Sequence, residues 1–595
     1  MRISISALLL AALTLVLAAE ATQAAPTTWY VKAGPTNGSG TFASPFNTIQ
    51  AGITAAVAAN GDNVTVLTGT YSAINFNGKN ITVQSASWTN PAGVAATIIN
   101  SPGGSPLVTF NHGENSGAVL QGFTITGGVW SGLDFPDLGT GGIYIYNSSP
   151  TIRNNVIANN STTDDGGGIC ILGFSSPVVV SNTISANSAG VDGGGVFVYT
   201  ASGYCAPQLL LNSVISNSAG DNGGGFCPFE SDAALAMSTS MVNNLIVANN
   251  AGDVGGGIFV GYQVQATINN DTIVGNMAFN SYGVGNGGGV GFLYANLSGQ
   301  IDSCLIYSNS AVGNGPQVSL ENGSVASILY SDLQGGYSAI YQATNSVANI
   351  LTYGAGNLAT DPLFGSPATG DYHLQSVAGR YNPANGSYFY DAATSPGLAA
   401  GDPAFTYSAQ PLPNGGRIEI GAYGNTAQAS LDGVLTLTAS LLHGWVYVNA
   451  ADAQPHDTLT VAVSNDPYSD TSYTVSTSLA AGPGLATFAS GTNSSTVYVY
   501  GTTSPTGTGS CQILAQVVGS PSGVRGSITL TANVRPLGDI DNSGAVNSSD
   551  LTSLNTRLNN LATGYPDYNF DLTGNGYVTA ADRVILYKIL DNLTP

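Results

Sequence analysis

The sequence predicts a mainly β protein whose largest part is a β-solenoid, a coil of short strands that completes one turn per repeat. Three observations predict this fold: a repeat of about thirty residues with two interleaved registers, short β-prone runs separated by Asn and Gly, and no helical period inside the repeat. Gly accounts for 78 of 595 residues, which favours turns and strands over helices. A chain of this length exceeds one ordinary domain unless it contains such an array.

The first register consists of five glycine triplets in the middle of the chain. They read DDGGGICI, VDGGGVFV, DNGGGFCP, DVGGGIFV and GNGGGVGF, and their last glycines are Gly168, Gly195, Gly225, Gly257 and Gly289. The successive intervals are 27, 30, 32 and 32 residues. This spacing sets the length of one turn of the coil, which we call a rung.

The second register lies between the triplets and is rich in asparagine. Its reference column is Asn159, Asn187, Asn217, Asn249, Asn276 and Asn309. This alignment gives an apolar column of Val156, Ile184, Val214, Ile246, Ile273 and Ile306. Two positions before it stand Asn154, Asn182, Asn212, Asn244, Asp271 and Cys304. We expect the apolar column to stack inside the coil and the asparagines to form hydrogen-bonded ladders at its bends.

Each period holds about three β-prone runs, such as 258–260, 266–268 and 272–274, so successive rungs would pair their strands in parallel. In this pattern the sequence resembles the right-handed parallel β-helix family, the pectin-lyase-like fold, over roughly Trp29 to Ser430. The resemblance implies an N-terminal cap helix in SPFNTIQAGITAAVAANGD, with Ile49, Ile53 and Val57 on one face. It also implies a closing segment that begins near DPLFGSPATGDYHLQS.

The five cysteines show no metal-type spacing and do not suggest a disulfide framework. Cys170 and Cys227 fall in one column with Phe197 on the rung between them. Two rungs span about 10 Å, beyond the reach of a disulfide, so we expect both thiols to be free.

Residues 1–25 have the layout of a secretory signal peptide, with an early Arg, an apolar run and small residues before the expected cleavage point. No later stretch is apolar enough to predict a membrane span. We therefore expect a secreted protein, extracellular or on the cell surface. The formal net charge is −22, and this excess of acid argues against nucleic acid as a partner.

The repeat ends near residue 430, and the expected β-helix domain spans residues 26–430. Eight alternating runs at roughly ten-residue spacing follow in residues 431–536. This pattern predicts an antiparallel β-sandwich of immunoglobulin-like size.

Residues 537–595 contain two loops with oxygen-bearing side chains at EF-hand-like spacing, 32 residues apart. The expected calcium ligands of the first loop are Asp539, Asp541, Ser543, Asn547 and Asp550, with the backbone carbonyl of Ala545. Those of the second are Asp571, Thr573, Asn575, Thr579 and Asp582, with the carbonyl of Tyr577. A helix follows each loop, the first with Leu551, Leu554, Leu558 and Leu561 on one face.

The paired loops resemble the type I dockerin family. The resemblance implies a small α-helical module that binds Ca²⁺ and docks on a cohesin-type domain. It assigns partner recognition to loop positions 10 and 11, which are Ser548, Ser549, Ala580 and Ala581. Thr573 replaces the usual acidic or amide ligand, so weaker binding of calcium by the second loop is expected.

The candidates for a catalytic or ion-binding site on the coil are acidic residues just before the glycine triplets: Asp164, Asp165, Asp192, Asp221 and Asp253. Stacked on consecutive rungs, they would bind calcium or supply an acid and a base to a glycan. The alternative is that each Asp organises its own turn.

Between Arg153 and Arg380 the sequence has no Lys or Arg, although a uronate lyase of this fold needs a cationic base. A glycoside hydrolase, which needs two carboxylates, fits better than a pectate-lyase-type enzyme. The dockerin-like tail favours a polysaccharide-related protein, either carbohydrate-binding or catabolic. The alternative is a non-catalytic adhesion or scaffold protein.

Overall fold

The computed structural model describes residues 25–591 except 102–105, 133–138, 201–203, 231–236, 280–284, 345–346, 412–413, 433–435, 443–444, 449–456, 465–473, 482–484, 487–495, 502–508, 520–522, 542, 544, 561–569, 571 and 573–576. Residues 1–24 of the expected signal peptide lie outside this range. The chain forms two compact units, and the second comprises Ser376–Ala392, Pro411–Gly415 and the residues from Leu431 onward. Each unit is described by itself.

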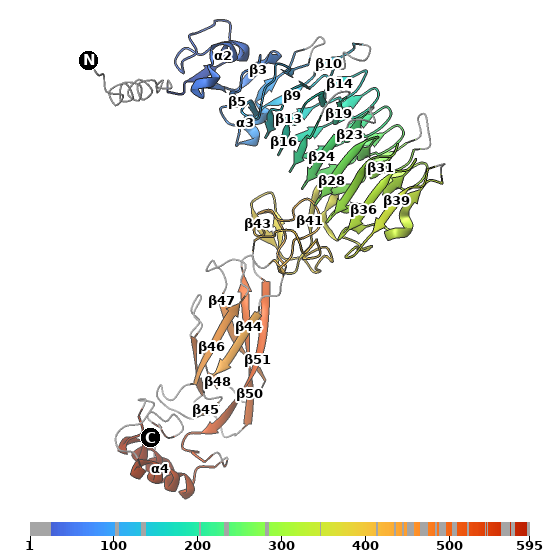
Figure 1. Cartoon of the computed structure of the whole chain (residues 1–595). Helices are drawn as coiled ribbons and strands as arrows, with labels where there is room; N and C mark the ends of the chain where they lie inside the picture. The colour runs from blue at the N-terminus through green and yellow to red at the C-terminus, as the bar shows by residue number, and fades with distance from the viewer. Residues whose placement is uncertain are drawn as a thin grey trace, which may run out of the picture. The chain divides into compact units, whose positions relative to one another are not determined.

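The first unit is a parallel β-coil built from four sheets (Figure 1). A rung with a strand in every sheet passes through them in the order D, A, B, C. Sheet A contains twelve strands: β1 (Thr28–Val31), β2 (Asn63–Val66), β5 (Thr82–Ser85), β8 (Val119–Gln121), β12 (Thr151–Arg153), β16 (Val178–Val180), β20 (Gln208–Leu210), β24 (Met237–Val242), β28 (Val264–Asn269), β32 (Ser298–Asp302), β36 (Val325–Leu329) and β39 (Ile350–Tyr353). Sheet B contains ten: β3 (Gly69–Tyr71), β6 (Thr97–Ile99), β9 (Thr124–Thr126), β13 (Val156–Ala158), β17 (Thr183–Ser185), β21 (Ser213–Ile215), β25 (Leu245–Val247), β29 (Thr272–Val274), β33 (Leu305–Tyr307) and β37 (Asp332–Leu333).

The other two sheets complete the circuit. Sheet C contains seven short strands: β10 (Val129–Trp130), β14 (Ser161–Thr162), β18 (Ser188–Ala189), β22 (Ser218–Ala219), β26 (Asn250–Ala251), β30 (Met277–Ala278) and β34 (Ser310–Ala311). Sheet D contains ten: β4 (Ile74–Asn75), β7 (Val108–Phe110), β11 (Ile143–Tyr146), β15 (Ile169–Leu172), β19 (Val196–Thr200), β23 (Phe226–Glu230), β27 (Ile258–Val260), β31 (Val290–Phe292), β35 (Val318–Leu320) and β38 (Ile340–Gln342).

Two ladders of asparagine side chains hold the bends of the coil. In the ladder after sheet B, the Oδ1 atom of Asn217 accepts hydrogen bonds from the backbone N–H and the Nδ2 of Asn187, both at 3.0 Å. Its own Nδ2 donates to the carbonyl of Ile184 at 2.9 Å. These asparagines are buried, so each side chain satisfies backbone groups that the tight bend removes from both sheet and solvent. The expectation of asparagine ladders is confirmed.

The register of the first repeat differs from the sequence alignment by one residue. Ile157, not Val156, pairs with Ile184 and is buried. The ladders correspondingly begin at Asn155 and Asn160 rather than at Asn154 and Asn159. The segment NNVIANN has Asn at both members of each pair, so the sequence offered no choice between them. Because side chains alternate along a strand, the shift turns Val156 outward.

Ladder position 271 carries an acid instead of an amide. Asp271 Oδ1 accepts from the backbone N–H of Asn244 at 2.6 Å and from its Nδ2 at 2.9 Å. Its Oδ2 is buried without a hydrogen-bond partner. Burial raises the pKa of Asp271 to about 8, against the weaker lowering effect of the two bonds from Asn244.

The helices of the first unit lie outside the repeat. α2 (Ile49–Ala55) and the short turn η1 (Ala58–Asn60) precede β2, and α3 (Pro91–Ala95) precedes β6. Ile49 and Ile53 of α2 are buried against the first rung, as expected for a cap. Val57 is half-exposed beyond the end of the helix, so its predicted place on the same face is wrong. The N–H of Val57 donates to Asp62 Oδ2 at 3.0 Å.

The closing segment, which follows β39, packs on the outer face of sheet B. It includes η3 (Pro367–Thr369) and the antiparallel strands β40 (Phe364–Ser366) and β41 (Asp371–Leu374), while η2 (Gly336–Ala339) lies just before β38. Tyr372 packs with Val247 and Val274, two outward residues of sheet B. Asn243 Nδ2 donates to the carbonyls of Ala422 at 3.0 Å and Gly424 at 2.7 Å. These contacts explain why the outer face of sheet B is apolar in its later rungs.

The second unit begins with the hairpin of β42 (Arg380–Asn382) and β43 (Ser387–Phe389). The eight predicted β runs each form a strand: β44 (Thr436–Leu441), β45 (Trp445–Val448), β46 (Asp457–Ser464), β47 (Thr474–Ala481), β48 (Leu485–Ala486), β49 (Thr496–Gly501), β50 (Gly509–Gly519) and β51 (Gly523–Pro536). They make two four-stranded sheets, ordered β44-β46-β49-β48 and β45-β51-β50-β47. Two helices follow, α4 (Ser548–Asn560) and α5 (Ala580–Leu590).

The four described thiols, Cys170, Cys205, Cys227 and Cys304, are buried and free. Cys170 pairs with Phe197, which pairs in turn with Cys227, so the predicted separation of two rungs is confirmed. Cys511 lies in β50.

We predict that Asp271→Asn stabilises the β-helix increasingly as the pH rises. An Asp has a pKa near 3.9 in an unfolded chain, so the folded protein holds the proton of Asp271 to higher pH. Its contribution to stability is therefore complete below about pH 4 and is lost as the pH rises through about 8. The Nδ2 group of an Asn at position 271 is a hydrogen-bond donor at every pH, so this variant avoids the loss at high pH.

Calorimetric melting at about pH 5 and about pH 9 checks this prediction, with the exposed Asp361→Asn as the matched control. The melting temperature of Asp271→Asn should exceed that of the wild type by more at the higher pH. An equal difference at both pH values would contradict it.

Candidate functional site

The first loop of the C-terminal module gathers three carboxylates. One oxygen each of Asp539, Asp541 and Asp550 lies within 4.8 Å of the others, and Asp539 and Asp550 are completely buried. Asp550 lies in the first turn of α4, and its Oδ1 accepts the N–H groups of Ile540 at 2.7 Å and Asp541 at 3.1 Å. Clustered buried carboxylates repel one another unless a cation lies between them. This donor set suits calcium, which takes six to eight oxygen ligands.

The remaining first-loop ligands expected from the sequence surround this cluster. The N–H of Ser543 donates to Asp539 Oδ1 at 2.9 Å, and the Asn547 N–H donates to Asp550 Oδ2 at 2.8 Å. The carbonyl of Ala545 accepts from the hydroxyl of Ser543 at 3.1 Å and from the Nδ2 of Asn547 at 3.2 Å. The hydroxyl and the backbone N–H of Ser543 hydrogen-bond to the carboxylate of Asp541, and these bonds lower the pKa of Asp541.

The second loop is described in part. Asp571, Thr573 and Asn575 lie outside the described residues. Asp582 is buried and accepts the N–H of Thr579 at 2.6 Å, while Thr579 caps α5. Tyr577 is half-exposed.

The two helices pack on a common core of their own. Leu554 of α4 and Leu586 of α5 are fully buried in it, with Leu551 and Leu558 partly buried, while Leu561 lies outside the described residues. Ser548 and Ser549 are exposed in the first turn of α4, and Ala580 and Ala581 are exposed in the first turn of α5. All four expected partner-binding residues are therefore accessible.

The glycine triplets bring the acidic turns flat onto the outer face of sheet D. Gly193 has a φ of +66°, and a Cβ added there would lie 2.7 Å from the Cβ of Phe197. A Cβ on Gly195, the last of the same triplet, would lie 2.5 Å from the carbonyl oxygen of Gly225 on the next rung. Only glycine permits both close approaches.

The acidic residues occupy two columns, so the single column expected from the sequence is wrong. In the inner column, the N–H of Asp192 donates to Asp165 Oδ1 at 2.8 Å, and the N–H of Asn222 donates to Asp192 Oδ1 at 2.7 Å. Asp165, Asp192 and Asn222 therefore form a short ladder in which each oxygen holds the next turn. This geometry matches the interpretation that an Asp organises its own turn.

The outer column contains Asp164, Val191, Asp221 and Asp253. The N–H of Asp221 donates to the carbonyl of Val191 at 2.7 Å, and the N–H of Asp253 donates to the carbonyl of Asp221 at 2.8 Å. Asp221 and Asp253 thus stand on adjacent rungs, about 4.8 Å apart along the coil.

Burial dominates the titration of these acids. It raises the pKa of Asp165 to about 8, helped by the charge of Asp192, and raises that of Asp192 to about 7. Burial and then the charge of Asp253 raise the pKa of Asp221.

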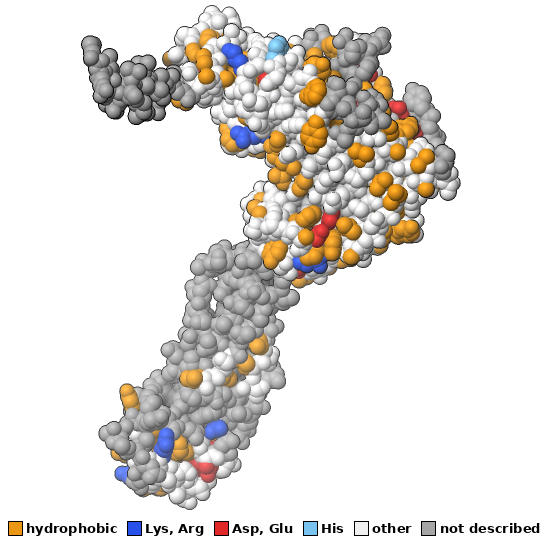
Figure 2. Space-filling view, viewed as in Figure 1, with side chains coloured by type: hydrophobic (Ala, Val, Ile, Leu, Met, Phe, Trp, Pro, Cys, Tyr) orange, Lys and Arg blue, Asp and Glu red, His pale blue; other side chains and the backbone are white. Residues whose placement is uncertain are grey.

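Three cations of the first unit, Lys79, Arg153 and Arg417, each donate hydrogen bonds to nearby groups. Lys79 Nζ donates to the carbonyls of Ile53, Thr54 and Ala56 at the end of α2, between 2.6 and 2.8 Å. Arg153 Nε donates to Gln121, and Arg417 donates to the carbonyls of Ala400 and Gly401. In Figure 2, blue cationic atoms appear on the visible face of the coil as isolated spots.

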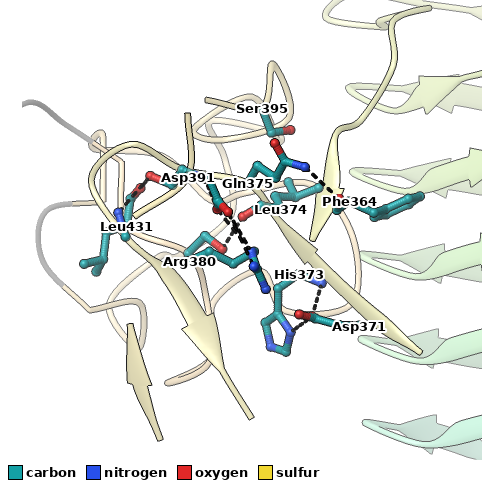
Figure 3. A network of polar contacts seen from close by, with 12 residues as sticks. Phe364, Asp371, His373, Leu374, Gln375, Arg380, Asp391, Ser395 and Leu431 are labelled. Carbon is teal, nitrogen blue, oxygen red and sulfur yellow. Dashed lines mark hydrogen bonds and ion pairs between the residues drawn. The ribbon is translucent and has the colours of Figure 1, made fainter. Parts of the chain in front are cut away.

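Two polar contacts in Figure 3 belong to the residues after the coil. In the first unit, His373 Nδ1 lies 2.7 Å from Asp371 Oδ1, and the ring stacks on Tyr423 with centroids 3.6 Å apart. In the second unit, Arg380 Nε lies 3.1 Å from Asp391 Oδ2. Because His373 is buried, we interpret its contact with Asp371 as part of the packing of the closing segment.

Comparison with known families identifies two parts of the chain. Residues 108–296 match the model of right-handed β-helix regions, and residues 537–591 match the type I dockerin domain. No curated protein matches the chain. The protein therefore contains a right-handed β-helix and a C-terminal dockerin, and dockerins of this type bind calcium and cohesins.

Sequence reasoning missed an aromatic surface beside the acidic turns. Tyr199 and Phe229 stack on neighbouring rungs on the outer face of sheet D, with centroids 6.2 Å apart. Periodicity alone did not reveal them, because aromatic residues within a strand are usually core residues.

We predict that Asp541→Ala weakens calcium binding at the first loop at least tenfold. Asp541 is exposed, so its removal deletes one oxygen ligand without opening the buried core. Calorimetric titration of the full chain with Ca²⁺ measures the effect, with exposed Asp361→Ala as control. Unchanged affinity at both calcium sites would contradict the assignment.

Proposed function

We propose that this is an exported protein whose β-helix acts on or binds polysaccharide while its dockerin attaches it, through calcium, to a cohesin-type partner. Dockerin-bearing proteins are typically extracellular or cell-surface proteins. Among the described residues, no helix is both long and apolar enough to cross a bilayer. The signal peptide at residues 1–25 supplies the route of export in this proposal.

The observation that carries the proposal is the cluster of Asp539, Asp541 and Asp550 at the start of a matched dockerin. Calcium held by Asp539, Asp541, Ser543, Ala545, Asn547 and Asp550 would fix the first turn of α4, and the second ligand set would do the same for α5. Ser548, Ser549, Ala580 and Ala581 would then form the recognition surface. The domain boundaries in this proposal are 26–430 for the β-helix and 537–595 for the dockerin.

Residues 431–536 complete the proposed architecture as an immunoglobulin-like sandwich between the two. Its two four-stranded sheets support this assignment.

Glycoside hydrolysis is the second candidate function, and the adjacent rungs of Asp221 and Asp253 favour it. Retaining glycosidases place their two carboxyl groups about 5–5.5 Å apart, close to one rung spacing. The raised pKa of Asp221 suits a general acid, and Asp253 would then act as the nucleophile. Asp165 and Asp192 hold turns and have no catalytic part in this mechanism.

We predict that cohesin binding by the full chain requires calcium and the exposed residues at the start of α4. Chelation should abolish binding to a panel of type I cohesins. The double change Ser548→Arg and Ser549→Arg should weaken it at least tenfold. Surface plasmon resonance measures both effects, with Ser188→Arg on sheet C as the control. Calcium-independent binding would refute the docking mechanism.

We predict that Asp221→Asn and Asp253→Asn each lower sugar release at least a hundredfold. Asp192→Asn keeps an oxygen for the N–H of Asn222, so it should leave the activity nearly unchanged. Activity should fall as the pH rises through the raised pKa of Asp221, because the general acid must be protonated. Reducing-sugar assays on neutral, amino-sugar and acidic polysaccharides provide the test. Wild-type inactivity on all of them would leave binding as the function of the β-helix.

A further inference from the structure

A recess lined by three aromatic residues lies at the corner where sheet D turns into sheet A. Phe229, Tyr262, Tyr294, Ala295 and Asn322 line it, and its volume is about 570 Å³. This size falls within the range of small-ligand sites. The recess is mainly apolar, as expected of a surface that stacks against the C–H face of a sugar ring.

Tyr294 lies at this corner in the left-handed backbone conformation, which is unfavourable for a bulky side chain. The strand register brings seven residues to equivalent positions: Asn147, Gly173, Thr200, Glu230, Tyr262, Tyr294 and Asn322. Four of them, Asn147, Gly173, Tyr294 and Asn322, have φ values between +47° and +68°. Asn and Gly tolerate this left-handed region, but a bulky aromatic residue is strained there. Tyr294 is nevertheless 48% exposed, so burial does not compensate for the strain. Strain of this kind at an exposed aromatic residue points to function.

The recess continues an aromatic row on sheet D. The rings of Tyr199 and Phe229, which pair across neighbouring rungs, are 6.2 Å apart with an interplanar angle of 17°. Phe229 belongs to the recess itself. From Tyr199 through Phe229 to the recess, the aromatic residues therefore pass from rung to rung along the axis of the coil, the direction in which an extended chain would lie.

Carboxylates border the recess on the side of the acidic turns. Glu321 directly precedes Asn322, and its Oε1 accepts from Asn286 Nδ2 at 2.9 Å. The N–H of Gly285, the residue before Asn286, donates to Asp253 Oδ1 at 3.3 Å. Burial raises the pKa of Tyr294, and the charges of Asp253, Asp221, Asp192 and Glu321 raise it further. The rim is therefore acidic.

We propose that this recess binds a hexosamine residue that carries a free amino group, within a polysaccharide chain. The proposal rests on the polysaccharide-binding half of the proposed function. The aromatic faces stack on the sugar ring and attract its ammonium group, and Glu321 and Asp253 neutralise the charge. A uronate would meet repulsion, since no Lys or Arg occurs between Arg153 and Arg380.

The test measures binding of the calcium-loaded full chain to three soluble oligosaccharides of equal length: a β-1,4-glucosamine oligomer, its fully N-acetylated counterpart and an oligogalacturonate. The wild type should bind the glucosamine oligomer at least tenfold more tightly than the acetylated one and should not bind the uronate. Tyr294→Asn should weaken glucosamine binding at least tenfold and raise the melting temperature, because Asn relieves the strain. A structural role for Tyr294 would instead lower the melting temperature.

Two further variants make the result decisive. Glu321→Gln should weaken binding of the glucosamine oligomer but leave binding of the acetylated oligomer unchanged. Tyr337→Asn, a change of an exposed tyrosine in η2, should have no effect. Equal affinity for the charged and acetylated oligomers, or undiminished binding by Tyr294→Asn, would overturn the proposal while the polysaccharide role stands. If the wild type binds none of a broader polysaccharide panel, that role fails as well, whatever the cohesin measurements show.

Discussion

The rest of the first unit depends on the hydrogen bonds that each rung makes to the next at its bends. A bend in a parallel coil leaves N–H and C=O groups that neither the sheet nor water can satisfy, and each buried group left unpaired costs on the order of 1–3 kcal/mol. The amide of Asn217 satisfies groups of both Asn187 and Ile184, because one side chain offers a donor and an acceptor. An uncharged ladder of this kind suits a chain in which only 7% of residues are charged.

The need to satisfy backbone groups at the bends also determines which acidic residues have a structural role. An Asp that occupies a ladder position, such as Asp165 or Asp192, uses its oxygen to hold the next turn. An Asp one residue earlier falls outside that ladder, as Asp221 and Asp253 do. A shift of one residue therefore places Asp221 and Asp253 in a second column, where Asp253 Oδ1 accepts the N–H of Gly285 on the next rung. Function on this surface is a property of register as much as of residue type.

The sequence predicted the coil, the asparagine ladders, the free cysteines and the dockerin, because each follows from local spacing. It misplaced the first rung, since NNVIANN presents two equivalent asparagines at each bend. The two acidic columns could have been separated by counting back from the glycine triplets: Asp165 and Asp192 stand three residues before the last glycine, and Asp221 and Asp253 stand four before it. The recess around Tyr294 could not be predicted without the register, because its residues come from separate rungs. The packing of Tyr372 on sheet B is a non-local contact with no periodic signal.

The β-helix and the dockerin both contain buried polar groups, and they compensate the cost of that burial in different ways. In the coil, side-chain amides on neighbouring rungs pair buried backbone groups of the bends without an ion. Tyr294 can be kept in a strained conformation because the hydrogen bonds of the rungs on either side fix the backbone. In the dockerin, Asp539 and Asp550 are buried within a single short loop, where no neighbouring rung can compensate their charges. In the proposed function calcium supplies that compensation, so the proposed attachment depends on the ion while the proposed glycan surface does not.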